Sequence, residues 1–339
     1  MTPQVLDIGG GDGEYIRAMF QQQFLNPLRD GRTPNLPSSL ISDDRGLKLW
    51  SEVTRAPEYY QTRDEIELFV AHGQDIAAKV PDGCSLIDLG SGDLRKVQPL
   101  LDHLEAAQKR VHYYSLDLSR AALQQGVSQF AERYQFIQCT GLWGSFDHGF
   151  TWVSKLSAGP KWLLSLGSIL GNGPLEDAVR GLSRWASLMS PDDRLLLCMD
   201  AHTDPNKIWK SYHDPHGCYE RFVRNGLHRS NKLLEYEWYA PDDWEMIGHL
   251  EPPMHQTLFR ARRSVDAAPV GIQFSEGDLI AFHGAFKYPP EIMRTQFSMA
   301  SLKELAVWKA PSSPICRWSY LFFHYHRTNS TMWNQMTIY

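Results

Sequence analysis

Between about residues 80 and 200, short apolar runs alternate with longer segments whose apolar residues recur at helical spacing. A short apolar run is typical of a buried strand, whereas apolar positions three and four residues apart are typical of one helix face. The apolar runs predict strands at residues 86–89, 111–118, 136–139, 162–166 and 194–200. The helical spacing predicts helices after residue 97 and at residues 121–134 and 175–189. This alternation predicts an α/β fold with a parallel, doubly wound sheet.

The segments on either side of this alternation have a different pattern. Residues 26–44 are rich in proline, serine, arginine and aspartate, which predicts a loop. Helices are predicted at residues 47–53 and 66–79, and Thr62 with Glu65 has the spacing of a capping box at the start of the second helix. After residue 200 the predicted helices are 207–212, 217–227 and 299–306, and the predicted strands are 233–239, 254–264, part of 274–287, and 318–325.

These patterns divide the 339-residue chain into two predicted domains and a tail. Residues 63–200 and 287–327 would form the sheet domain. Residues 14–62 and 201–286, which break the alternation and are rich in His, Trp and Tyr, would form an α+β cap over the sheet. The polar residues 328–339 would form a loose tail.

The strand at residues 86–89 ends at Gly90-Ser91-Gly92, and a helix follows. Glycine lets a cofactor approach the backbone closely, because no side chain stands in the way. Asp117 ends the next predicted strand about 25 residues later, where a carboxylate can bind ribose hydroxyls. NAD-binding turns have a third glycine, which this turn lacks, so the turn favours S-adenosylmethionine (SAM). The alternative is an ordinary turn between a strand and a helix.

A second glycine-rich stretch, Val5-Leu-Asp-Ile-Gly-Gly-Gly-Asp-Gly13, also resembles a cofactor loop. No second strand that ends in an acid follows it. An N-terminal strand and a flexible turn are therefore the favoured interpretation of this stretch.

Composition and charge limit the class of partner. The net charge is −5 and no cluster of Lys and Arg stands out, which argues against a nucleic acid or an anionic membrane. The chain has 11 Trp, 14 Tyr and 15 Phe. We expect most of these rings in the core and some around a pocket for a flat or apolar ligand.

The five cysteines are widely spaced and form neither a C-x-x-C motif nor a zinc-ligand pattern. Reduced, buried thiols and no bound metal are therefore expected. The first residues lack the basic start and apolar core of a signal peptide, and no run is long enough to span a bilayer. We expect a cytoplasmic protein.

Several motifs in order resemble the SAM-dependent histidine Nα-methyltransferases of ergothioneine biosynthesis. They are Pro57-Glu-Tyr-Tyr-Gln-Thr-Arg63, Leu89-Gly-Ser-Gly92, Leu116-Asp-Leu-Ser119 and Leu166-Gly-Ser-Ile-Leu-Gly-Asn172, and the resemblance extends over about residues 45–325. The stretch from Thr140 to Asp147 is similar to the fungal branch, which includes the 4-dimethylallyltryptophan N-methyltransferases of ergot alkaloid biosynthesis. The resemblance implies a Rossmann-like methyltransferase sheet with a substrate-binding cap.

The resemblance also implies roles for individual residues. For the cofactor these are Gly90, Ser91 and Gly92 around the methionine portion, Lys96 nearby, Asp117 on the ribose, and Leu142 and Trp143 where the family often has an Asp-Phe pair near the adenine. The head of the substrate would be held by Asn172, Tyr212 and one of the adjacent Tyr59 and Tyr60. Asn172, Tyr212 and Tyr60 are the predicted catalytic residues, and the sequence leaves open which tyrosine of the pair faces the substrate.

The chain departs from the histidine enzymes at the ring-binding positions. Those enzymes place a Glu and a Ser in a late strand, and the matching stretch, residues 279–287, puts Ala281 and His283 there. Exchanging Glu for Ala removes a charge and frees volume, which favours a larger, more apolar ring such as indole. His283 is either a satisfied core histidine or a partner for the indole N–H.

These observations predict N-methylation of the α-amine of an aromatic amino acid, tryptophan or 4-dimethylallyltryptophan, by direct displacement from SAM. The amine must be neutral, and no general base is evident. A histidine Nα-methyltransferase and a non-catalytic binding or regulatory protein are the alternatives. We expect a monomer or a weak homodimer, and the number of methyl groups transferred stays open.

Overall fold

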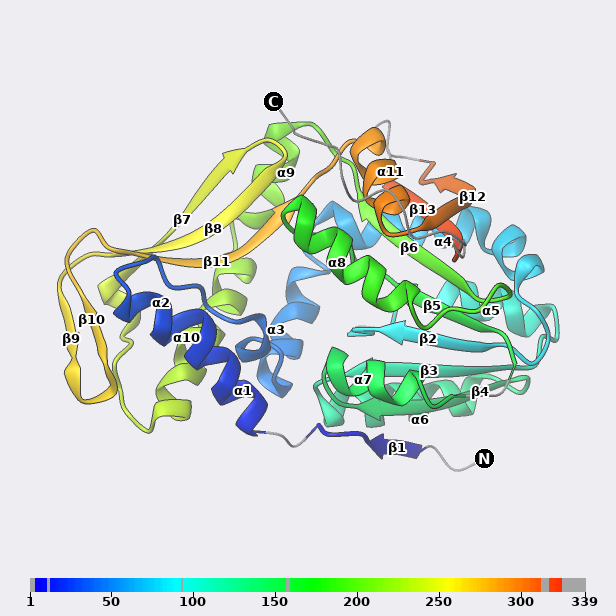
Figure 1. The fold of residues 1–339 in the computed structure, drawn as a ribbon, viewed down its shortest axis with the longest axis horizontal. Helices are drawn as coiled ribbons and strands as arrows, with labels where there is room; N and C mark the ends of the chain where they lie inside the picture. Colours follow the sequence, from blue (N-terminus) through cyan, green and yellow to red (C-terminus); the bar gives the residue numbers. More distant parts are fainter. Residues whose placement is uncertain (1–3, 11–12, 93, 157–158, 312–316, 325–339) are drawn as a thin grey trace, which may run out of the picture.

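The computed structural model describes residues 4–10, 13–92, 94–156, 159–311 and 317–324. Its largest sheet has eight strands in the order β1-β4-β3-β2-β5-β6-β13-β12, on the right of Figure 1. The strands are β1 (Gln4–Asp7), β2 (Ser85–Leu89), β3 (Val111–Asp117), β4 (Ile137–Trp143), β5 (Lys161–Ser165), β6 (Arg194–Asp200), β12 (Leu302–Lys309) and β13 (Arg317–His324). Strands β1 to β6 are parallel, and β13 runs antiparallel between β6 and β12. The predicted parallel sheet is confirmed.

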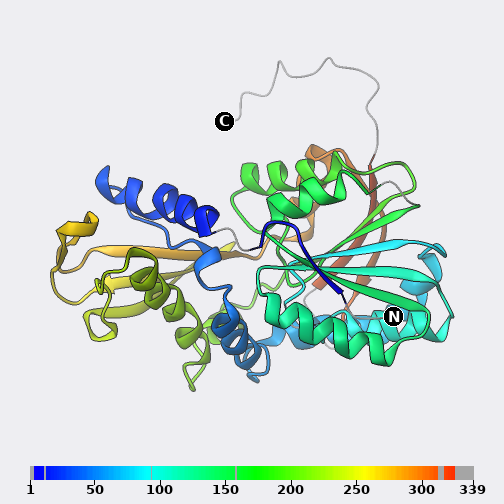
Figure 2. The ribbon, with the colours of Figure 1, turned by 90° about the horizontal axis from the view of Figure 1, so that it is seen from below.

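Helices cover both faces of this sheet, as Figure 2 shows. One face packs against α4 (Tyr60–Lys79), α5 (Gln98–Ala106) and α6 (Arg120–Arg133). The other packs against α7 (Phe146–Val153), α8 (Leu175–Ala186) and α11 (Pro290–Met299). Buried strand residues alternate between the two cores: Leu86 belongs to the first and Ile87 to the second. Strands buried on both faces read as continuous apolar runs, which is why the sequence predicted them well.

The segments predicted as the cap lie together on the left of Figure 1. Their helices are α1 (Gly13–Phe20), α2 (Asn26–Arg29), α3 (Asp44–Val53), α9 (Pro205–Tyr212) and α10 (Cys218–Leu234), with a π-helix (Gln21–Leu25) and 3-10 turns at Ser38–Leu40, Pro241–Asp243 and Ala268–Val270. Their strands are β7 (Trp244–Glu251), β8 (Met254–Ala261), β9 (Val265–Ala267), β10 (Ile272–Phe274) and β11 (Leu279–Phe286). Strands β7, β8 and β11 form an antiparallel sheet, and β9 pairs with β10. These elements share a separate core that includes Phe24, Trp244 and Phe259.

The two parts of the cap are joined by backbone hydrogen bonds between distant segments. The N–H of Leu36 donates to the carbonyl of Ala281, and the N–H of Ala281 donates to the carbonyl of Pro34, each over 2.8 Å. Both polar groups of the Ala281 backbone are therefore used to hold the N-terminal part of the cap against β11. The predicted tail at residues 328–339 lies outside the described residues.

Some predicted elements were wrong at their boundaries. Helix α4 begins at Tyr60, so Thr62 and Glu65 lie within it and form no capping box; the buried Glu65 carboxylate instead accepts the N–H of Gly167 at 2.9 Å. Strand β4 continues to Trp143 because β1 pairs with it along the outer edge. Gly141 allows this close approach, since an added Cβ would lie 3.1 Å from Val5.

Other predictions after residue 200 and before residue 44 were also wrong. The chain forms no strand at residues 233–239, because α10 continues to Leu234 and Trp238 is buried with its indole N–H on Ser230. Residues 299–306 hold the end of α11 and the start of β12 rather than a helix. Residues 26–44 include α2 and a 3-10 turn, and β7 was not predicted. The strand predicted in the N-terminal stretch is confirmed: it is β1, at the edge of the main sheet.

Cys84, Cys139, Cys198 and Cys218 are free thiols, and Cys316 lies outside the described residues. Within the part of the chain that the structure describes, no helix combines the length and the apolar character that crossing a bilayer requires.

Candidate active site

A cavity of about 370 Å³ lies at the carboxyl ends of the parallel strands. Residues that follow β2, β3, β4 and β5 form one side, and residues of α3, α9, α10 and β11 form the other. In open α/β sheets, ligands bind at this edge, next to the point where the strand order reverses. Here the reversal falls between β2 and β5, with the Gly90 turn between them.

The glycine turn and the acid at the end of β3 are joined directly. Gly92 donates its N–H to Asp117 Oδ2 at 2.9 Å, and Ser119 donates its N–H to Oδ1 at 3.1 Å. Burial raises the pKa of Asp117, and these two N–H groups act in the opposite direction. Gly90 has φ +72° and an added Cβ would lie 2.9 Å from Ile169, so only glycine fits this position.

The other predicted cofactor residues differ in their access to the cavity. Lys96 borders it, and an added Cβ on Gly167 would lie 2.6 Å from Lys96 Nζ. Ser91 is buried and does not border the cavity. The structure therefore brings Gly90, Gly92, Lys96 and Asp117 together around one end of the cavity.

The structure does not bring Leu142 and Trp143 to the cavity. Because β4 extends to Trp143, Leu142 lies in the core and the indole N–H of Trp143 donates to the carbonyl of Leu118 at 2.9 Å. Gly144, Ser145 and Phe146 border the cavity instead. Ser145 caps α7 in a capping box with His148, which places Phe146 at the first position of that helix. The Ser-x-x-His spacing of Ser145 and His148 was the signal in the sequence that could have predicted the start of α7.

Asn172 and His283 meet at the wall of the cavity. Asn172 Oδ1 accepts the N–H of Phe286 at 2.7 Å, and Asn172 Nδ2 lies 3.0 Å from His283 Nε2. Since the backbone N–H needs an acceptor, the amide can only donate to His283, whose Nε2 must then be unprotonated. The ring borders the open cavity, and burial by the surrounding protein with the charge of Lys287 lowers the pKa of His283 to about 4. His283 is therefore neutral at pH 7.

Of the adjacent tyrosines, only Tyr59 borders the cavity. Its ring packs edge-on against those of Trp50 and Tyr212, at 5.3 Å and 6.4 Å between centroids. Tyr60 is buried, and its hydroxyl donates to Asp200 Oδ2 at 2.7 Å. Tyr60 was predicted as a catalytic residue, but it is turned away from the cavity. Of the two tyrosines, Tyr59 is therefore the one that can face a substrate.

This arrangement predicts different effects for two matched substitutions. Tyr60→Phe should lower the free energy of unfolding by about 1.5–3 kcal/mol, because a buried carboxylate loses a hydrogen bond. Tyr59→Phe should leave stability within about 1 kcal/mol of the wild type and lower kcat/KM about tenfold, because a hydroxyl is lost at the cavity. Urea unfolding and methyl-transfer rates measure the two effects. Equal stability losses in both variants would contradict the assignment.

A buried polar network lies behind the cavity wall. Lys287 Nζ lies 2.7 Å from Asp200 Oδ2 and donates to the Tyr212 hydroxyl at 2.9 Å. Burial alone would lower the pKa of Lys287, but Asp200 and Tyr212 outweigh it and raise the pKa. Lys287 and Tyr212 border the cavity, whereas Asp200 and Tyr60 lie behind them. Lys287 was not among the predicted site residues, because its partners come from distant segments of the chain.

Of the two predicted ring-binding residues, His283 borders the cavity and Ala281 does not. Phe282 and Ala285 border it as well. The pairing of β11 with β8 shifts register between Ala281 and Gly284. This bulge changes which side chains of β11 face the cavity.

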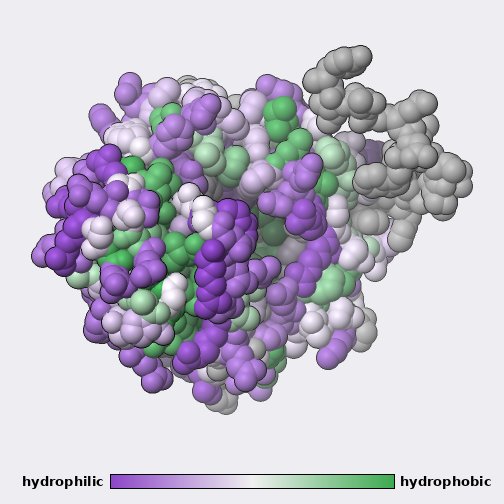
Figure 3. Space-filling view, turned by 60° about the vertical axis from the view of Figure 1, so that its left-hand side comes forward, coloured by the Kyte–Doolittle hydropathy of each residue, from purple (hydrophilic) through white to green (hydrophobic). Residues whose placement is uncertain are grey.

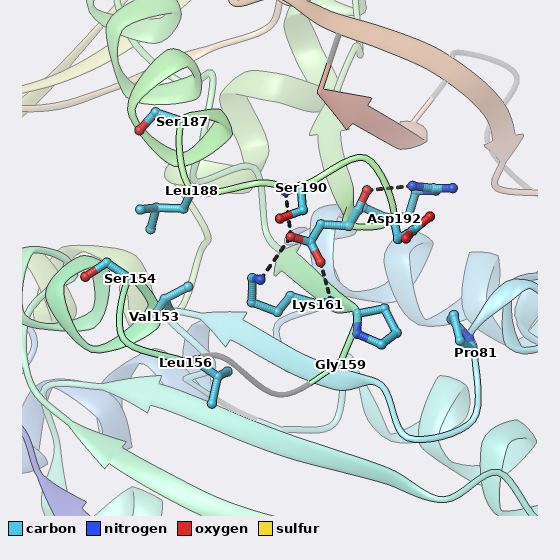
Figure 4. A pocket seen from close by; sticks show the side chains of 13 residues that line it. Pro81, Val153, Ser154, Leu156, Gly159, Lys161, Ser187, Leu188, Ser190 and Asp192 are labelled. Atoms are coloured by element: carbon cyan, nitrogen blue, oxygen red, sulfur yellow. Dashed lines mark hydrogen bonds and ion pairs between the residues drawn. The ribbon is translucent and has the colours of Figure 1, made fainter. Parts of the chain in front are cut away.

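A second cavity, of about 840 Å³, lies at the amino ends of β5 and β6 and is drawn in Figure 4. Its polar groups already pair with one another: Asp193 accepts the N–H groups of Lys161 and Ser190 and lies 3.0 Å from Lys161 Nζ. It contains none of the predicted site residues. Within the described ranges, no group of three or more His, Cys, Asp or Glu could hold a metal ion.

Comparison with known proteins identifies the family. Residues 20–319 match the family model of the histidine-specific, SAM-dependent methyltransferases. The chain belongs to this family. Its cofactor is SAM, and the open glycine turn and the Asp117 carboxylate fit that group.

This methyltransferase is similar to several fungal proteins. It is 34% identical over 279 residues to ergothioneine biosynthesis protein 1 of Neurospora crassa. This match covers 80% of the chain but only 32% of the Neurospora protein. It is 30% identical to N-methyltransferase imqF of Aspergillus flavus, and the match covers 90% of this chain and 85% of that protein. It is 28% identical to 4-dimethylallyltryptophan N-methyltransferase easF of Arthroderma benhamiae, and the match covers 90% of this chain and 93% of that protein. The chain thus spans about a third of the Neurospora protein.

Proposed function

We propose that this methyltransferase transfers a methyl group from SAM to the α-amine of an aromatic amino acid, tryptophan or 4-dimethylallyltryptophan, in indole alkaloid biosynthesis. Residues 63–200 with 287–327 would bind SAM, and residues 14–62 with 201–286 would bind the substrate. The chain spans nearly the full length of the Arthroderma relative, whose name gives this substrate.

One observation carries the proposal. One cavity is bordered by Asp117, Asn172 and Tyr212 and also by aromatic and small apolar side chains. These are Trp50, Tyr219, Phe222, Phe282 and Ala285. Among the described residues that border the cavity, Asp117 is the only carboxylate. An apolar ring end without an acid suits an indole better than an imidazole that must be bound through its nitrogens.

The residues suggest how the reaction proceeds. When bound, SAM supplies the methyl group and leaves as S-adenosylhomocysteine (SAH). The amine nitrogen forms the new N–C bond as the C–S bond breaks and its electrons remain on sulfur, and the product ammonium then releases a proton. Asn172, Tyr59 and Tyr212 would hold the amino acid head in line with the methyl group. The ammonium of Lys287 at the cavity wall would disfavour a charged amine, which has no lone pair.

Histidine is the second candidate substrate, because the Neurospora relative is named for ergothioneine biosynthesis and the family for histidine. His283 Nε2 already accepts from Asn172, so in this arrangement it does not accept an indole N–H. An indole would then be held by packing against the aromatic side chains rather than by this histidine.

Mass spectrometry of the products separates these candidates. The protein is incubated with SAM and equimolar histidine, tyrosine, tryptophan and 4-dimethylallyltryptophan, with SAH-saturated protein as the control. We expect a methylated indole substrate as the main product. Trimethylated histidine would contradict the indole assignment. No product despite measured SAM binding would favour the non-catalytic alternative.

The remaining expectations about partners stay predictions. A monomer or weak homodimer and a cytoplasmic location are still expected. On the face drawn in Figure 3, hydrophobic side chains appear in several patches with hydrophilic residues between them. Size-exclusion chromatography with light scattering would measure the oligomeric state.

A further inference from the structure

Gln61 lies in the first turn of α4, between Tyr60 and Thr62. Its side chain is 4% exposed and borders the cavity. Its Nε2 donates to Ser211 Oγ at 3.0 Å and to the Tyr212 hydroxyl at 3.3 Å. Gln61 therefore contacts Tyr212 from the start of α4, whereas Lys287 contacts it from the position that follows β11.

The orientation of the Gln61 amide is fixed by its neighbour. Ser211 donates its hydroxyl proton to the carbonyl of Ile208 at 2.8 Å, so toward Gln61 it can only accept. The Nε2 group must face Ser211 and Tyr212, and Oε1 must face away from them. Gln61 Oε1 is buried and has no hydrogen-bond partner among the described residues. A buried carbonyl without a hydrogen-bond partner lowers the stability of the fold. This loss accompanies the orientation in which Gln61 Nε2 donates to Tyr212.

The hydroxyl of Tyr212 consequently accepts two hydrogen bonds, from Lys287 Nζ at 2.9 Å and from Gln61 Nε2. A phenolic oxygen has two lone pairs and one proton. With both lone pairs engaged, the group can meet a ligand in the cavity only by donating that proton. A carboxylate oxygen is the strongest acceptor in an amino acid, whereas the neutral amine must keep its one lone pair for the methyl group.

We propose that Gln61 is a positioning residue: together with Lys287 it makes Tyr212 an obligate hydrogen-bond donor, which selects amino acids with a free carboxylate over the corresponding amines. This inference rests on the proposed function, since it assumes that the cavity holds the head of an amino acid. It deepens that function because it requires a free carboxylate on the substrate and attributes this requirement to Tyr212, Gln61 and Lys287.

The test uses Gln61→Glu, Gln61→Leu and two controls. Glutamate has the same shape but presents an acceptor to Tyr212, so the tyrosine proton is drawn away from the substrate. Leucine removes one of the two donors. Gln74 lies exposed on the same helix, so Gln74→Glu and Gln74→Leu carry the same chemical changes away from the cavity. The readouts are kcat and KM for two probe pairs, L-tryptophan with tryptamine and L-histidine with histamine, and the SAH dissociation constant.

We expect Gln61→Glu to lower the ratio of kcat/KM for acid over amine by about tenfold, mainly through KM for the amino acid, because one hydrogen bond to a charged group is lost. Gln61→Leu should lower the ratio about threefold, since Lys287 still donates. SAH affinity and the Gln74 variants should remain at wild-type values.

Two results would overturn the inference while leaving the proposed function intact. One is a wild-type protein that methylates acid and amine equally well. The other is a Gln61→Glu variant that slows both members of a pair equally, which a merely structural role would produce. If the wild type methylates neither these four probes nor 4-dimethylallyltryptophan, the proposed function fails. Calorimetry on the SAH complex then decides the inference: tighter binding of tryptophan than of tryptamine supports it, and equal or absent binding overturns it.

Discussion

Replacing Lys287 with methionine should lower the free energy of unfolding by about 3–5 kcal/mol, because it leaves the Asp200 carboxylate charged and buried without its partner. Side chains of both residues are almost fully buried, at 5% and 1% exposed, and their charged atoms lie 2.7 Å apart. Removing one charge of such a pair costs far more than the intact pair contributes. Urea unfolding monitored by tryptophan fluorescence measures the loss.

Lys79→Met is the matched control, because Lys79 also pairs with an aspartate, Asp75 at 3.1 Å, but both side chains are exposed. It should cost at most about 0.5 kcal/mol. The double variant Lys287→Met with Asp200→Asn should recover part of the lost stability, since no buried charge remains. If Lys287→Met were as mild as Lys79→Met, the buried pair would not be an ion pair in solution.

The second large effect is expected at Asp117. Asp117→Ala should weaken SAH binding by about 100-fold, because the carboxylate that would bind the ribose hydroxyls is lost. Asp117→Asn should be nearly as harmful, since both oxygens accept backbone N–H groups, from Gly92 and Ser119, and an amide NH₂ would face one of them.

Isothermal titration calorimetry with SAH measures these affinities. Asp177→Asn, at an exposed position on α8, is the control and should bind SAH like the wild type. If Asp117→Ala bound SAH with wild-type affinity, Asp117 would not be a cofactor-binding residue. There would then be no reason to place the ribose of the cofactor at the end of β3.

The sheet was predictable because each of its central strands carries its own signal. Strands β2, β3, β5 and β6 are buried on both faces, so their apolar runs do not depend on distant partners. The cap gave weaker signals. Trp238 and Tyr239 look like strand residues, yet both are buried in a loop that follows α10, where tertiary packing outweighs β propensity.

The same distinction applies to the site. The glycine turn and Asp117 could be located because a single strand, turn, helix and strand places them. Lys287 and Gln61 could not, because their significance comes from Asp200, Ser211 and Tyr212, which meet them only in the folded chain. Ala285 was missed because a one-residue irregularity in pairing has no mark in the alternation of apolar and polar residues.

The hydrogen bonds between residues 34–36 and Ala281 have a consequence for synthesis on the ribosome. On the order of 245 residues must be translated after Leu36 before its partner exists, which takes roughly 10 to 50 seconds. Strands β2 to β5 emerge in the meantime together with all their neighbours in the sheet, whereas β6 still lacks β13. The nascent chain would therefore complete the central strands first, while residues 34–36 stay without their contacts to β11 and available to chaperones.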